Sequence, residues 1–216
     1  SQNQDLSFNP PNKNEQGTIS YISDPNNPVP WSTEKRITQG HLWMVEDQRF
    51  VANREDVIIF QTVPIQKDLS IGGPIYVKLY FSSTGTDMDW IVKLIDVYPE
   101  KDDKEKTINN EIGGSQILLS ADVFRSKYRN NFENPEPIIP YSIDSIRFNI
   151  GDKLHTFKKG HRIMIQIQNS WFPLIDRNPQ QFMDIYKVNE NDYKIEENTL
   201  YFKYPYLSKI EIPVLK

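Results

Sequence analysis

The chain has 216 residues, of which 38% are hydrophobic and 25% are charged, and its formal net charge is −4. This length fits one large β domain better than two small ones, and the apolar content is sufficient for a packed core. The acidic balance, without a basic stripe, argues against a nucleic-acid partner. No apolar run approaches the roughly 20 residues that span a bilayer, so we expect no membrane partner either.

The chain contains no cysteine, which excludes disulfides, thiolate metal sites and a cysteine nucleophile. The composition is compatible with the cytoplasm and with a periplasmic or secreted protein that uses no disulfides; of these we favour the periplasmic or secreted location. The first residues begin with Ser, are polar and lack the apolar core of a signal peptide. We therefore expect a fragment or processed form of a longer protein.

The first part of the chain, residues 1–35, is polar and contains three X-Pro pairs between positions 24 and 30. Because the residue before a proline is biased toward extended conformations, we expect an extended linker or lead-in here. A folded domain would then occupy residues 36–216.

Alternation of apolar and other residues with a period of two dominates that domain and predicts strands. It is clear at 75–82, whereas residues 90–98 (WIVKLIDVY) are apolar on both faces, as expected for a strand inside a sandwich. Turn signals containing glycine separate the elements. Further strands are expected at 56–63, 116–119, 143–150, 162–169, 198–203 and 208–215.

Helical spacing is weak throughout. The best short candidate is 120–128 (SADVFRSKY), where Ser120 or Asp122 would cap one or two turns. Many strands of irregular length, joined by long crossover loops, favour an all-β fold. We predict a double-sheet jelly-roll β-sandwich rather than an up-and-down barrel.

The sequence lacks the common catalytic motifs. It contains no G-x-S-x-G nucleophile elbow, no G-x-x-x-x-G-K-[ST] phosphate loop and no H-E-x-x-H zinc pair. The spacing of His41, His155 and His161 indicates neither a Ser-His-Asp set nor a metal site. We expect His155 to be half-buried and bonded to backbone, and His161 to lie on the surface. No catalytic residue, metal or cofactor is predicted.

Two acidic and aromatic features have alternative interpretations. Asp87 and Asp89 could act as an acid–base pair or bind Ca²⁺, but we favour a turn cap before the next strand. The loop after residue 170 could stack Trp171 on a sugar, but we favour a plug at the end of the core. In the same loop we expect Asp176 and Arg177 to form a structural pair.

Five runs together resemble one hydrolase family. The family is the C-terminal non-catalytic domain of the X-prolyl dipeptidyl-peptidase / cocaine esterase (CocE/NonD) class of α/β-hydrolases, with glutaryl-7-ACA acylase and α-amino-acid ester hydrolase members the most similar. The resemblance covers nearly all of the chain from Leu6 and implies a jelly roll with a galactose-binding-domain-like topology. The runs are 21–31 (YISDPNNPVPW), 46–62 (EDQRFVANREDVIIFQT), 77–99 (VKLYFSSTGTDMDWIVKLIDVYP), 124–137 (FRSKYRNNFENPEP) and 154–180 (LHTFKKGHRIMIQIQNSWFPLIDRNPQ).

The resemblance also implies that the catalytic triad belongs to an upstream α/β-hydrolase domain that this chain lacks, from which residues 1–35 would lead in. This domain would pack against that catalytic domain and its cap, help wall the substrate cleft and be inactive alone. Homo-oligomers would form through the parent enzyme.

The wall element that the resemblance implies is the loop with His41, Leu42, Trp43 and Met44, directly before the charged turn at 47–49. Its apolar run would be costly to expose on an isolated domain and makes sense against a second domain. The alternative is that Trp43 folds back into this domain's own core.

Three functions therefore stay open. The first is an accessory domain of a serine hydrolase acting on acyl, ester or amide bonds. The second is a free-standing carbohydrate-binding module, and the third is a structural domain that holds subunits together. The first agrees best with the absent nucleophile elbow.

Overall fold

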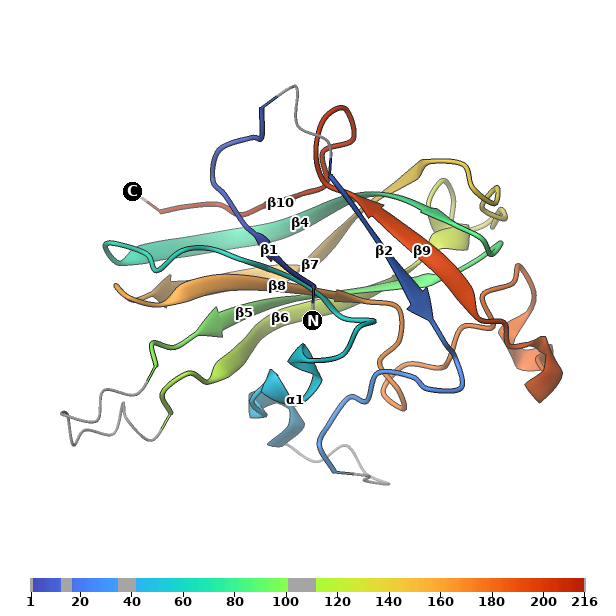
Figure 1. Ribbon diagram of the computed structural model, residues 1–216, viewed down its shortest axis with the longest axis horizontal. Helices are drawn as coiled ribbons and strands as arrows, with labels where there is room; N and C mark the ends of the chain where they lie inside the picture. The colour runs from blue at the N-terminus through green and yellow to red at the C-terminus, as the bar shows by residue number, and fades with distance from the viewer. Residues whose placement is uncertain (1, 13–16, 35–41, 101–111, 216) are drawn as a thin grey trace.

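The computed structural model describes residues 2–12, 17–34, 42–100 and 112–215, which form a two-sheet β-sandwich (Figure 1). The first sheet has the order β1 (Gln2–Asp5), β3 (Ile58–Gln61), β8 (Arg162–Gln168), β5 (Asp89–Val97) and β6 (Gln116–Arg125). The second sheet contains β4 (Leu69–Ser83), β7 (Asp144–Phe157), β10 (Lys209–Glu211), β9 (Glu196–Tyr201) and β2 (Thr18–Ser23).

The long strand β4 organises the second sheet. It pairs with β7 along one edge, and with β10 and then β9 along the other, while β2 continues the sheet from β9. The alternation at 75–82 places four side chains of β4 between the sheets. These are Ile75, Val77, Leu79 and Phe81, all buried. The expected all-β jelly-roll sandwich is confirmed.

The described parts of the expected lead-in at 1–35, residues 2–12 and 17–34, are instead part of the sandwich. Strand β1 pairs in parallel with β3, and β2 pairs antiparallel with β9 over six residues. After β2, Val29 is buried, and its backbone forms hydrogen bonds with Ser170 and Phe172. The folded domain therefore begins before residue 36, because this segment adds backbone pairing to both sheets and buries Ile19 and Tyr21 in the core.

The prediction of a short helix at 120–128 is also wrong. Residues up to Arg125 continue β6, which pairs with β5 from Asp89 to Val97, and only Ser126–Tyr128 turn into a short 3-10 helix, η2. A one-turn helix has little stability of its own, so the sheet ladder and its packing decide.

Helical structure in the described ranges is short. It comprises η1 (Leu42–Val45), α1 (Arg49–Ala52), η2, η3 (Ile185–Lys187) and η4 (Glu190–Asp192). None of the helices in these ranges is long and apolar enough to cross a membrane.

The central strand β5 of the first sheet is buried on both faces, and every one of its residues is buried. Its inner face meets the second sheet. Its outer face is covered by the chain around α1 and by the loop after β8, which place Val51 and Trp171 in separate apolar clusters. Figure 1 shows α1 beneath the strands of this sheet. This cover layer carries the predicted wall element.

Candidate functional site

The predicted wall element is a single turn of 3-10 helix, η1. His41 lies outside the described residues, and only the backbone of Leu42 and Trp43 is described. The side chains of Met44 and Val45 are 57% and 62% exposed. The end of η1 thus presents two adjacent apolar side chains to solvent.

The three residues after η1 fix it to the sandwich. The Glu46 carboxylate accepts hydrogen bonds from the hydroxyls of Ser32 and Thr33, both at 2.9 Å. The Asp47 carboxylate accepts from the backbone N–H of Gln116 at 3.1 Å, and its guanidinium partner is Arg49, at 2.7 Å. These contacts hold η1 at the start of β6.

A second anchor lies beneath the cover layer and was missed by sequence reasoning. Gln48 is buried, and its side-chain oxygen accepts a hydrogen bond from Lys93 Nζ at 3.0 Å. Lys93 is 0% exposed, and its ammonium lies 4.9 Å from the centre of the Trp171 ring. Burial lowers the pKa of Lys93 to about 7. A lysine inside the apolar run 90–98 was the available signal.

Trp171 and Arg177 take separate places in the loop after β8. Trp171 is 5% exposed and packs with Trp31 and Ile91, so it has no face to offer a sugar ring. Arg177 does not pair with Asp176 as expected. Its guanidinium binds Glu190 at 3.0 Å and lies 4.1 Å from the ring centre of Tyr193. Neighbouring side chains of an irregular loop diverge, so Arg177 reaches a partner across the loop.

The acidic pair before β5 forms a buried hub. Arg125 binds both carboxylate oxygens of Asp89, at 2.7 and 2.8 Å. The amide nitrogen of Asn178 donates to Asp89 at 2.8 Å and to Asp87 at 3.3 Å. Asp87 also accepts from the backbone N–H of Lys127 at 3.0 Å. The hub joins the loop after β8 to the turn before β5.

This hub is unsuited to the chemistry considered for it. Asp87 and Asp89 are 0% and 1% exposed, so no substrate reaches them. Burial, reinforced by the charge of Asp89, raises the pKa of Asp87 to about 6. Asp89 is occupied by a guanidinium, which leaves no ligand set for Ca²⁺. The two carboxylates are buried and bonded to residues distant in the sequence, whereas the sequence suggested a local turn cap.

Two of the three histidines meet at one carboxylate. Asp96 Oδ2 lies 2.9 Å from His155 Nε2, and Asp96 Oδ1 lies 2.8 Å from His161 Nδ1. His155 therefore bonds a side chain rather than backbone, and His161 is mostly buried rather than on the surface. No serine is hydrogen-bonded to either ring in the described part of the chain, and no metal-binding cluster occurs there.

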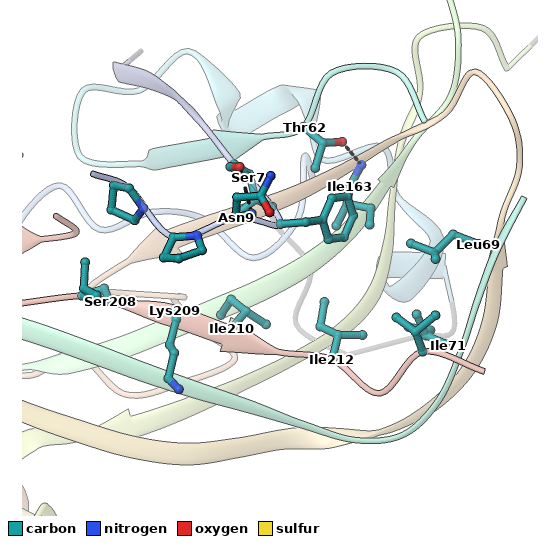
Figure 2. A pocket seen from close by; sticks show the side chains of 16 residues that line it. Ser7, Asn9, Thr62, Leu69, Ile71, Ile163, Ser208, Lys209, Ile210 and Ile212 are labelled. Atoms are coloured by element: carbon teal, nitrogen blue, oxygen red, sulfur yellow. Dashed lines mark hydrogen bonds between the residues drawn. The ribbon is translucent and has the colours of Figure 1, made fainter. Parts of the chain in front are cut away.

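An apolar cavity of about 370 Å³ opens between the two sheets, beside β10. Ile71, Ile163 and Ile212 are among its walls, and Figure 2 shows Lys209 pointing away from Ser7 and Asn9 on the opposite wall. Its polar groups are used internally: Thr62 Oγ1, for example, accepts from the N–H of Ile163 at 3.0 Å. The cavity offers apolar contact and no catalytic group.

Comparisons with known proteins identify the family of this domain. Residues 11–211 match the sequence profile of the X-Pro dipeptidyl-peptidase C-terminal non-catalytic domain. The chain belongs to this family. The name of the family describes the domain as non-catalytic.

The relatives of this family domain are larger hydrolases. The chain is 27% identical over 197 residues to the cocaine esterase of Rhodococcus sp. (strain MB1 Bresler), covering 91% of this chain and 32% of that enzyme. It is 36% identical to an aminopeptidase from the marine sediment archaeon Thaumarchaeota archaeon, with a TM-score of 0.89, covering 97% of this chain and 35% of that one.

A third relative is an α-amino acid ester hydrolase, 38% identical with a TM-score of 0.91, where the match covers 98% of this chain and 34% of that one. The chain thus spans about a third of the length of each of these relatives. The expected resemblance to this hydrolase class is confirmed.

Proposed function

We propose that this domain is an accessory part of a larger serine hydrolase that cleaves ester or amide bonds. It packs on the α/β-hydrolase catalytic domain and its cap, helps wall the substrate cleft through η1, and has no hydrolytic activity alone. The observation that carries the proposal is family membership over residues 11–211, together with matches to enzymes about three times as long.

The geometry of η1 supports its role as a wall. Met44 and Val45 are exposed, while the residues that follow are fixed by Glu46, Asp47 and the buried pair of Gln48 and Lys93. Exposed apolar side chains on a backbone that is anchored by hydrogen bonds lose little conformational entropy when another surface covers them. A flexible loop would be a poorer boundary for a substrate pocket.

The test uses the longer hydrolase that contains this domain. Met44→Lys should raise KM for an ester with a bulky acyl group several-fold and change kcat for a small acetyl ester little. The matched control is Leu154→Lys, because Leu154 is also apolar and is 81% exposed on β7. Equal effects of both variants, or none from either, would contradict the assignment of η1.

A further inference from the structure

Exposed apolar side chains gather on two loops that follow different strands. Ile139 and Tyr141, before β7, are 70% and 79% exposed; Phe182 and Tyr186, in the loop with η3, are 41% and 90% exposed. Single exposed apolar residues are ordinary, but a group on adjoining loops marks an interaction site. We call these four side chains the end patch.

Both loops are attached to the same turn between β4 and β5. The N–H of Tyr141 donates to the carbonyl of Ser83 at 2.8 Å, and the N–H of Phe182 donates to Thr86 Oγ1 at 2.7 Å. Lys127 Nζ donates to the carbonyl of Met183 at 3.1 Å and joins the two loops directly. Figure 1 shows both loops at the same end of the sandwich.

The backbone of Tyr141 is strained. Its φ is 63°, in the left-handed region that bulky side chains avoid because of steric clash with the backbone. Glycine or asparagine would occupy this turn at less cost. Here the strain holds an aromatic ring in solvent, where the isolated domain gains nothing from it.

The loop that carries Tyr141 is held rigidly from below. Arg129 donates to Asp144 at 2.5 Å, and to the carbonyls of Glu136 and Pro137, both at 2.9 Å. One guanidinium thus spans the loop from its base to its middle. The half of the end patch with Ile139 and Tyr141 is therefore held in place before any partner arrives, which lowers the entropic cost of docking.

Charge and chain length identify the occupant. Glu133 and Glu136 are the only charged residues between positions 130 and 143, and both are exposed. Lys187, the lysine next to Tyr186 on the other loop, already pairs with Asp184 of that loop at 3.4 Å. A second copy docked symmetrically through the end patch would therefore bring Glu133 and Glu136 toward an already acidic surface, which disfavours self-association. The relatives instead contain about twice as much additional polypeptide as this domain supplies.

We infer that the end patch docks on the catalytic domain of the same longer protein, against an apolar centre with a Lys or Arg facing Glu133 and Glu136. The inference rests on the proposed function and adds a surface distinct from η1. The two sites lie at opposite ends of β6, since η1 is followed by the bridge from Asp47 to Ile117 and the end patch begins beyond Arg125.

Hydroxyl-radical footprinting read by mass spectrometry tests this on the 216-residue chain and on the longer protein. Oxidation of Tyr141 and Tyr186 should fall at least fivefold in the longer protein, while Leu154 is unchanged. Oxidation of Met44 reports η1 in the same spectra. Protection of Met44 without Tyr141 and Tyr186 overturns the docking inference alone, whereas protection of none of them overturns the proposed function as well. Protection that grows with the concentration of the 216-residue chain overturns it in favour of self-association.

The variant Tyr141→Gly adds a second test, in which the change in Tm should have opposite signs in the two proteins. In the 216-residue chain it relieves strain and should raise Tm by about 1–3 °C. In the longer protein it removes a docking contact and should lower Tm. Equal shifts in both proteins would show that the ring has no partner.

Discussion

The two faces of β5 are buried in different ways. On the inner face, Trp90, Val92 and Leu94 meet the apolar side chains of the second sheet. On the outer face, Lys93 lies beside Trp171 beneath the cover layer, and Asp89 is held in the buried hub by Arg125. The inner face supplies the non-directional burial that any sandwich needs. The outer face uses specific hydrogen bonds, and these fix the two segments that carry η1 and the loop after β8.

The contrast indicates where function could be added to this fold. A sheet face that packs on another sheet has little freedom to vary, because close packing penalises each change in volume. A face covered by connecting segments can hold them in defined positions through a few buried polar groups. The loss of stability should therefore depend on the change in side-chain volume for substitutions on the inner face. On the outer face it should depend on the change in charge and on pH.

The largest effect is expected for Trp90→Ala. Trp90 is 0% exposed and its ring centre lies 5.2 Å from that of Phe81, so the cavity should cost about 3–5 kcal/mol in the free energy of unfolding. Trp171→Ala, the same deletion on the outer face, should cost less because it opens Lys93 to water. Urea titrations of both variants measure the two losses in the free energy of unfolding. A larger loss for Trp171→Ala than for Trp90→Ala would contradict the proposed difference between the two faces.

Asp89→Asn should rank next, at roughly 3 kcal/mol, because it leaves the guanidinium of Arg125 buried without its carboxylate. Chemical denaturation at pH 7 provides the value. A loss below 1 kcal/mol would mean that the hub contributes no more than an exposed ion pair does.

Lys93→Met should stabilise the domain at pH 7 by about 1–4 kcal/mol, because it removes an amine buried without a carboxylate partner. The folded-state pKa of Lys93, about 7, lies below its unfolded value of about 10.4. The unfolded state therefore binds the extra proton between these values, and wild-type stability rises with pH across the window. The gain from Lys93→Met should be greatest below pH 7 and shrink toward pH 10; a pH-independent gain would show that volume alone decides.

The smallest effect is expected for Glu211→Gln. Glu211 pairs with Arg147 at 3.1 Å, but the two side chains are 41% and 52% exposed. Exposed pairs contribute less than about 1 kcal/mol, and salt screens them. Thermal unfolding in low and high salt should place this variant close to wild type, and a loss as large as that of Asp89→Asn would remove the distinction between buried and exposed pairs.

The sequence predicted strands that show clear alternation of buried and exposed residues, and strands that are apolar throughout. Alternation identified the inward residues of β4, and the continuous apolar run identified β5. It did not identify β1, a polar strand of four residues that gains its stability from backbone pairing. It also missed β2, because the alternation that buries Ile19 and Tyr21 there extends over only six residues. Local spacing and capping residues predicted a helix over 120–128, but there the hydrogen-bond ladder of β6 with β5 outweighs local preference.

The candidate site could be predicted only in part, for a related reason. Three apolar residues before a charged turn predicted an apolar wall element at 42–44; Met44 is exposed, and the wall role stays a prediction. The pairing of Arg177 with Glu190, and of Lys93 with Gln48, joins residues 13 and 45 positions apart in the sequence. Such partners are set by the path of loops in space, which local patterns do not encode.

The central claim is that this domain serves a catalytic domain and performs no hydrolysis alone. The most direct measurement is the hydrolysis of nitrophenyl acetate and butyrate by the pure 216-residue chain, with the longer hydrolase as a positive control. The account predicts a rate equal to that of buffer and of the heat-denatured chain. A saturable rate above both, abolished by a serine-directed phosphonate, would contradict it.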